Sequence, residues 1–115
     1  METTACAFAP DDVHLATVHF DGAVRIWNVD ARTEVATLVG HAGAVYSVAY
    51  HPDGALLATG GADATIAIWD VRTGDQLLTL RGHDMYVHDL VWSPDGARLY
   101  SASGDGTVRI WDAAE

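Results

Sequence analysis

The sequence predicts an all-β protein built from three copies of one antiparallel unit, and three observations support this prediction. Short runs of β-branched and aromatic residues alternate with turn sequences, and no segment has a helical period long enough to compete. The step from Trp27 to Trp69, 42 residues, is repeated from Trp69 to Trp111 without insertion or deletion. A proline–aspartate turn keeps the same step, at residues 10–11, 52–53 and 94–95.

Each unit has the sequence pattern of four short strands joined by tight turns. In the middle unit, the run AVYSVAY is followed by the turn Pro52-Asp53-Gly54 and then by an apolar run of small residues. A second turn precedes the run TIAIWDV, and a third turn leads to the last strand. The expected strands of this unit therefore form an antiparallel meander, at residues 44–50, 55–61, 65–71 and 76–80.

The other two units follow from the same step. The first begins with a strand at residues 4–8, and the third ends at Trp111-Asp112 after three strands, so that its outer strand is lacking. We therefore expect residues 1–115 to form a single array, with units at about residues 3–40, 44–82 and 86–112.

Composition and charge limit the classes of function. The chain of 115 residues carries 16 acidic and 6 basic side chains, for a formal charge of -10. This negative field disfavours nucleic acids and anionic membrane surfaces as partners. Aspartate side chains in turns, which bond the local backbone, account for much of the acid. Cys6 has no second cysteine to pair with, and neither a signal peptide nor a membrane-spanning run is present, so we expect a cytoplasmic protein.

Hairpin geometry gathers similar residues of each unit at one end of the array. The first strand of the middle unit leaves Gly40-His41, and the second strand returns to the turn that holds Asp63. His83 and Asp105 repeat this arrangement in the third unit. Each complete unit thus brings a histidine, an aspartate and a turn to the same end.

The complete units resemble WD40 repeats. Gly40-His41 leads to Trp69-Asp70, and Gly82-His83 leads to Trp111-Asp112, while the first unit has Trp27-Asn28 in place of Trp-Asp. Three copies in phase cover essentially the whole chain. The resemblance implies three four-stranded blades of a β-propeller, the last without its outer strand, and a role as a protein-interaction scaffold rather than an enzyme.

A serine, a histidine and an aspartate close in space suggest a hydrolase triad as an alternative. We reject it because the set recurs in both complete units, whereas a catalytic site is usually single. The resemblance implies a structural network instead, in which a buried tryptophan donates to a hydroxyl, the hydroxyl meets a histidine, and the histidine meets an aspartate. The expected members are His41, Thr59, Asp63 and Trp69; His83, Ser101, Asp105 and Trp111; and Thr17, Asp21 and Trp27.

The first network is expected to lack a histidine, because the corresponding position would precede Met1. We also expect neither a metal nor a cofactor. The histidines outside the networks have no metal-ligand spacing, and Gly104-Asp105-Gly106 is a hairpin turn rather than a phosphate-binding loop.

Three blades cannot close a ring, and two explanations remain open. Self-association would close it, with two copies giving six blades, within the usual range, and three giving nine. Alternatively, the chain is a fragment of a larger protein of the same kind. In either case an open array would expose some apolar residues on the flanks of its terminal blades, among Val18, Val24, Ile26, Val91, Val108 and Ile110.

The resemblance places partner contacts on the face formed by the turns that hold the histidines and aspartates. The candidate residues for a protein or peptide partner are Tyr86, His88, Tyr46, Phe20 and Met85. The alternative is that Tyr46 packs between blades and Phe20 covers a hairpin. A purely architectural assembly, natural or designed and without a ligand, is the second hypothesis for function.

Overall fold

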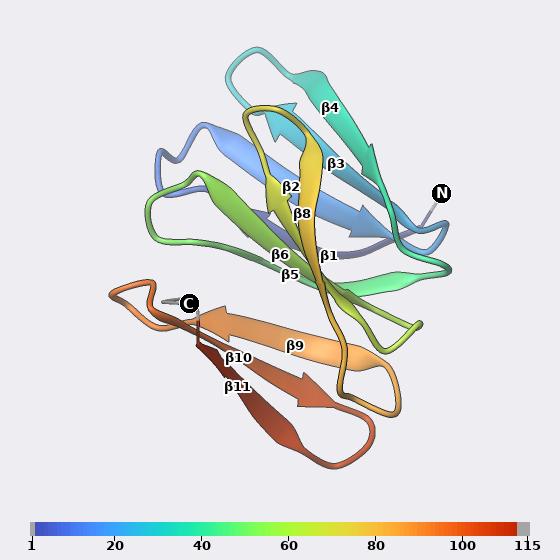
Figure 1. Ribbon diagram of the computed structural model, residues 1–115. Helices are drawn as coiled ribbons and strands as arrows, with labels where there is room; N and C mark the ends of the chain where they lie inside the picture. The colour runs from blue at the N-terminus through green and yellow to red at the C-terminus, as the bar shows by residue number, and fades with distance from the viewer. Residues whose placement is uncertain (1, 113–115) are drawn as a thin grey trace.

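Three antiparallel sheets stack side by side in chain order in the computed structural model, which describes residues 2–112 (Figure 1). Blade 1 has the strand order β1-β2-β3-β4, blade 2 the order β5-β6-β7-β8, and blade 3 the order β9-β10-β11. The predicted fold class is confirmed, including the count of four, four and three strands in the described residues. No helix among residues 2–112 is long and apolar enough to span a bilayer.

The strands are short and closely match the sequence pattern. Those of blade 1 are β1 (Thr3–Phe8), β2 (His14–His19), β3 (Ala23–Asn28) and β4 (Thr33–Val39). Those of blade 2 are β5 (Val45–Tyr50), β6 (Leu56–Gly61), β7 (Ile66–Asp70) and β8 (Asp75–Leu80). Those of blade 3 are β9 (Val87–Trp92), β10 (Arg98–Ser103) and β11 (Val108–Asp112).

Turn aspartates set where the strands end. Asp53 Oδ1 accepts the backbone N–H of Ala55 at 2.8 Å, and Asp95 Oδ1 accepts that of Ala97 at 3.0 Å. The next residue adopts a left-handed conformation, with φ of 79° at Gly54 and 75° at Gly96. Glycine adopts this conformation without strain, and an aspartate tolerates it better than most residues. Blade 1 has Asp12 there, with φ of 60°.

The core lies between the blades rather than inside one sheet. One cluster joins blade 1 to blade 2, and its buried members are Ala16, Val18, Val24, Ile26, Leu38, Val45, Leu57, Ala67 and Trp69. A second cluster joins blade 2 to blade 3, with Ala58, Ile66, Ile68, Val87, Leu90 and Leu99. Each blade junction is therefore a small apolar core, and the first strands β1, β5 and β9 lie next to one another along one side.

The expected exposure of apolar residues on the terminal blades is found on blade 3, where Val91 is also 55% exposed, but not on blade 1, where Val18 is fully buried. Val24 and Ile26 are 1% and 4% exposed, because their face of blade 1 packs on blade 2. Their counterparts in blade 3, Val108 and Ile110, are 68% and 62% exposed. The face of blade 3 that holds Val108 and Ile110 is therefore open, whereas the same face of blade 1 is covered by blade 2. Blade 1 exposes Phe8 instead.

Candidate functional site

Blade 2 contains a chain of hydrogen bonds that begins at a buried tryptophan. Trp69 Nε1 lies 2.9 Å from Thr59 Oγ1, which lies 2.8 Å from His41 Nε2. The indole N–H can only donate, so Thr59 Oγ1 accepts from it and still has a proton and a second lone pair for His41. Because the Asp63 carboxylate can only accept, His41 Nδ1 donates to it, and both carboxylate oxygens are 3.3 Å away.

Blade 3 repeats this chain with a serine in place of the threonine. Trp111 Nε1 donates to Ser101 Oγ at 2.9 Å, and Ser101 Oγ lies 2.7 Å from His83 Nε2. His83 Nδ1 lies 3.0 Å from Asp105 Oδ2. The structure thus brings together the four predicted members of each complete network.

Each network fastens the loop before a blade to the turn between its second and third strands. Asp63 Oδ2 accepts the backbone N–H of Ala42, and Asp105 Oδ2 accepts that of Asp84, both at 3.0 Å. Burial raises the pKa of Asp63, but hydrogen bonds from Thr65 and from the Ala42 backbone outweigh it and hold the pKa below its ordinary value. These carboxylates are therefore anionic at neutral pH and accept the histidine proton as well as the loop amide.

This geometry is that of a structural network rather than of a nucleophile with its base. Ser101 is 1% exposed, and its oxygen already accepts the Trp111 indole proton. A catalytic serine must reach a substrate carbonyl, and this one is enclosed between strands. Leaving a buried indole N–H or histidine unpaired costs about 1–3 kcal/mol, so the network contributes to the stability of each blade.

Blade 1 differs from the expectation, because its network does contain a histidine. Trp27 Nε1 donates to Thr17 Oγ1 at 2.8 Å, and Thr17 Oγ1 lies 2.8 Å from His19 Nε2. His19 Nδ1 faces Thr3 Oγ1 at 3.3 Å. The histidine comes from β2 itself rather than from a preceding loop, and Asp21 accepts the Ala23 amide at 3.1 Å instead of the histidine proton. The signal was present, since residues two apart on a strand share a face.

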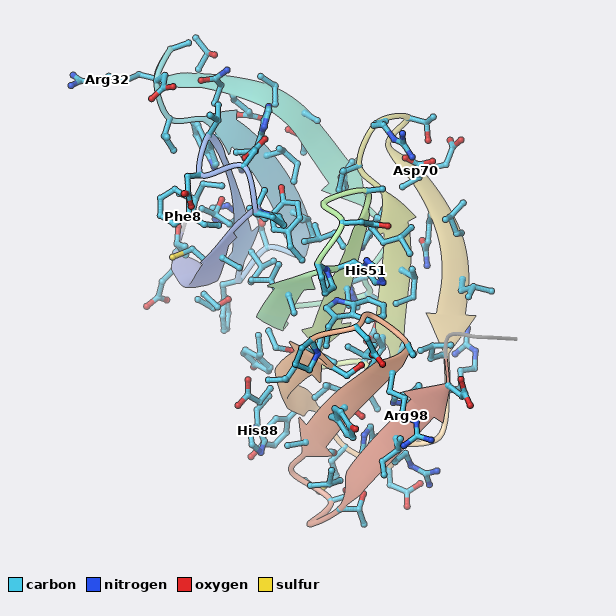
Figure 2. All side chains as sticks on the ribbon, turned by 90° about the vertical axis from the view of Figure 1, so that its left-hand side faces the viewer. Phe8, Arg32, His51, Asp70, His88 and Arg98 are labelled. Atoms are coloured by element: carbon cyan, nitrogen blue, oxygen red, sulfur yellow. The ribbon has the colours of Figure 1, made fainter. Side chains whose placement is uncertain are left out.

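An aromatic cluster lies where the first strands of blades 2 and 3 meet. The rings of Tyr46 and Tyr86 are 5.9 Å apart and nearly perpendicular, and the ring of His88 lies 6.0 Å from that of Tyr86. Tyr86 is 40% exposed, and His88, which Figure 2 labels on blade 3, is exposed as well. Gly104 makes room for this arrangement, because a Cβ there would meet the Tyr86 ring at 2.4 Å.

The remaining two candidate residues, Met85 and Phe20, are both exposed, but only Met85 is next to this cluster in the sequence. Met85 precedes Tyr86, and Phe20 occupies the turn between β2 and β3, with its backbone N–H bonded to Glu2 O at 2.9 Å. Within residues 2–112, no ring contact joins Phe20 to Tyr46 or Tyr86. We define the aromatic cluster as Tyr46, Tyr86 and His88. Among the same residues, no group of three histidine, cysteine, aspartate or glutamate side chains is placed to hold a metal ion.

Comparison with known proteins agrees with this architecture. The profile of the family described as "WD domain, G-beta repeat" matches residues 3–28, 32–70 and 74–112. Part of the chain is 36% identical over 53 residues to "Pre-mRNA-processing factor 19" from Bos taurus, Mus musculus and Homo sapiens. That match covers 42% of this chain and only 10% of each relative. With three matched repeats that correspond to three sheets, the chain belongs to the WD40 repeat family.

Proposed function

We propose that this chain is a protein-interaction scaffold and that the aromatic cluster is its contact surface for a protein or peptide partner. WD40 repeats generally mediate protein–protein interaction, which supports the class of function. The observation that supports this surface is the presence of exposed aromatic rings beside the turns that the networks fasten. Aromatic side chains on a rigid support provide large contact area at a small cost in conformational entropy.

A capture experiment with a matched variant tests this proposal. The chain is immobilised and incubated with lysate, and the captured proteins are quantified for wild type, Tyr86→Ala and Leu77→Ala. Leu77 is an exposed apolar residue on β8, far from the cluster in the sequence of strands. We expect Tyr86→Ala to reduce capture of a specific partner by about tenfold or more, since hot-spot aromatics contribute about 2 kcal/mol. Equal loss in both variants, or none in Tyr86→Ala, would contradict the proposed surface.

The second part of the proposal is that two copies complete a six-bladed ring. At the junction of blades 1 and 2, Val24 and Ile26 meet Trp69 and Leu57 in one cluster. Val108 and Ile110, which occupy the positions of Val24 and Ile26 on blade 3, are exposed. The counterparts of the second pair, Trp27 and Leu15, lie on blade 1. A second copy would thus bring together the positions that already meet within the chain.

The mass of the purified chain in solution tests this assembly. Light scattering on a sizing column is expected to give one species of two 12.3 kDa chains. A species of three chains would instead mean nine blades. A monomer that aggregates or melts without cooperativity would contradict ring formation by this chain alone and favour the alternative, a piece of a larger propeller.

A further inference from the structure

A hollow of about 100 Å³ lies on the open face of blade 3, which no other sheet of residues 2–112 covers (Figure 1). Asp89 from β9, Ala102 from β10 and Val108 from β11 are among the residues that line it. Asp89 and Val108 are exposed, so the hollow can be reached from solution. A water molecule takes up about 30 Å³ in the liquid, so the hollow has room for a short side chain.

The equivalent place on blade 2 is filled by a side chain of the next blade. With the repeat step of 42 residues, Asp89 and Ala102 correspond to Ser47 and Gly60. Val87 is fully buried against these two residues. Its Cγ1 would lie 2.6 Å from a Cβ added at Gly60, and its carbonyl accepts the Ser47 hydroxyl at 3.2 Å. The hollow on blade 3 is therefore the place where the first strand of another blade would insert this residue.

Thr3 is the residue of blade 1 that corresponds to Val87. Val45, the counterpart in blade 2, is fully buried at the junction with blade 1, whereas Thr3 is exposed. The three residues have the same backbone position, since the pairing register of each first strand shifts directly after them. A second copy that places its blade 1 on the open face of blade 3 would thus present Thr3 to the hollow.

The polar groups at this contact differ from those inside the chain. At the junction of blades 2 and 3, Ser47 donates and the Val87 carbonyl accepts. Asp89 cannot donate when it is ionised, so it needs a donor from the other side. The Thr3 hydroxyl is such a donor. It lies 3.3 Å from His19 Nδ1, and a hydroxyl that accepts there keeps its own proton for a carboxylate.

A second pair of positions exchanges size across the same contact. At the junction of blades 2 and 3, Ala58 on β6 and Leu90 on β9 belong to one buried cluster. Their counterparts on the two open flanks are Tyr100 of blade 3 and Cys6 of blade 1. The small residue is thus replaced by a large one on blade 3, and the large residue by a small one on blade 1. Cys6 is exposed and Tyr100 is partly exposed, so both are available for contact.

This contact requires a wider spacing than the junction of blades 2 and 3. Ala102 has a Cβ where Gly60 has none, and Gly60 is the position at which that junction is tightest. The junction of blades 1 and 2 shows that the fold accepts a side chain there. It has Val18 at this position, and both Val18 and Val45 are fully buried in its cluster. A wider spacing also leaves room for a large side chain, which Tyr100 provides.

We propose that the hollow on blade 3 receives Thr3 of a second copy of this chain, whose hydroxyl donates to Asp89, and that Tyr100 packs against Cys6 of that copy. The inference rests on the two-chain ring proposed above and identifies the residues that select its contact. Each change on the flank of blade 3 is matched by a change on the flank of blade 1. A blade with valine at the position of Thr3 would leave Asp89 without a donor, so the flank distinguishes between blades.

The dissociation constant of the two-chain assembly tests the polar pair, and light scattering on the full chain over a range of concentrations measures it. Thr3→Val should raise this constant by about tenfold or more, because the Asp89 carboxylate loses its donor on being buried. In the Asp89→Ser background the same change should cost less than about threefold, because serine and valine reproduce the pair of Ser47 and Val87. Loss of the contact between Thr3 and His19 alone would cost the same in both backgrounds.

The size pair is tested in the same way. Tyr100→Ala should weaken assembly by about tenfold, because it leaves a gap at the contact. Adding Cys6→Leu should recover most of this loss, since the two changes reproduce Ala58 and Leu90. Leu77→Ala on β8 is the control and should assemble as wild type does. These sites are not buried in the single chain, so each variant should fold.

The outcomes separate this inference from the ring on which it rests. If wild type forms the two-chain species and the costs within each pair are strictly additive, the proposed pairs are wrong while the ring stands. If the Tyr100 and Thr3 variants assemble as wild type does, the pairs are wrong as well. A wild-type chain that stays single at every concentration would contradict both the ring and the pairs.

Discussion

At the scale of single residues, one hydroxyl in each blade links a tryptophan to a histidine; those of Thr59 and Ser101 are buried, and that of Thr17 is partly buried. Thr17, Thr59 and Ser101 each accept an indole N–H and contact a histidine ring. Two of these histidines come from the loop before the blade, but His19 comes from the strand itself. The role of a side chain therefore follows from its direction in space, and the repeat phase alone does not reveal it.

The protonation of His19 gives a test of its network. Burial, and then the charge of Arg25, lower the pKa of His19 below 6.5, while Asp21 and Glu34 act in the opposite direction. The fold thus favours the neutral ring, and the unfolded chain binds the proton first as the pH falls. The free energy of unfolding should therefore decrease as the pH falls below about 6.5. Urea unfolding between pH 7.5 and 5 should show a weaker pH dependence in His19→Gln than in wild type.

The control for this measurement is His88→Gln, which changes an exposed ring and should keep the wild-type pH dependence. The aspartates whose pKa values are lowered, such as Asp63, do not interfere with it. Their stabilising effect is complete above 3.8 and is lost only as the pH falls further. An identical dependence in His19→Gln and wild type would contradict the assignment to His19.

At the scale of strands, turn chemistry explains why the element boundaries could be predicted. Aspartate bonds to the turn backbone set the strand ends, and each expected strand of blade 2 lies within about one residue of the observed one. The complete networks could be inferred because the family resemblance supplies their pattern. The hollow on blade 3 could not be inferred, because it depends on how the blades pack, which strand periodicity does not specify.

Gly60 on β6 controls how closely blades 2 and 3 approach. A Cβ at this position would lie 2.6 Å from Ser47 Oγ and 2.6 Å from Val87 Cγ1. We expect Gly60→Ala to lower the free energy of unfolding by about 1–3 kcal/mol, because the junction must widen to accept the methyl group. The double variant with Val87→Ala tests the cause in a denaturant cycle. Shortening Val87 removes its Cγ1 contact but leaves its Cβ at 2.8 Å and Ser47 Oγ at 2.6 Å, so the cost of Gly60→Ala should shrink in part. Strictly additive costs would show that the Cγ1 contact contributes nothing to it.

At the scale of the whole molecule, the arc of three blades has two different open flanks. Ile110 is exposed on one flank, and its counterparts Ile26 and Ile68 are buried in the two internal junctions. We expect Ile110→Asp to convert the proposed two-chain assembly into single chains, because a carboxylate would be buried in an apolar junction. Light scattering over a range of concentrations measures this, and Leu77→Asp on β8 is the exposed control. Assembly that persists in Ile110→Asp would show that this flank is not the contact.

The open flanks also determine what would limit the number of chains in a head-to-tail assembly. In a head-to-tail assembly, each added copy covers the open flank of the last chain and exposes an identical flank of its own. The strength of the contact alone therefore does not limit the number of chains. Only curvature does, since the ring closes when the angles between successive blades add up to a full circle. The hydrogen bond from His51 to the Gly96 carbonyl, across the junction of blades 2 and 3, and the missing side chain at Gly60 both help to set one of those angles. A methyl group added at Gly60 would therefore change the stoichiometry of a ring, or turn it into an open spiral, as well as its stability.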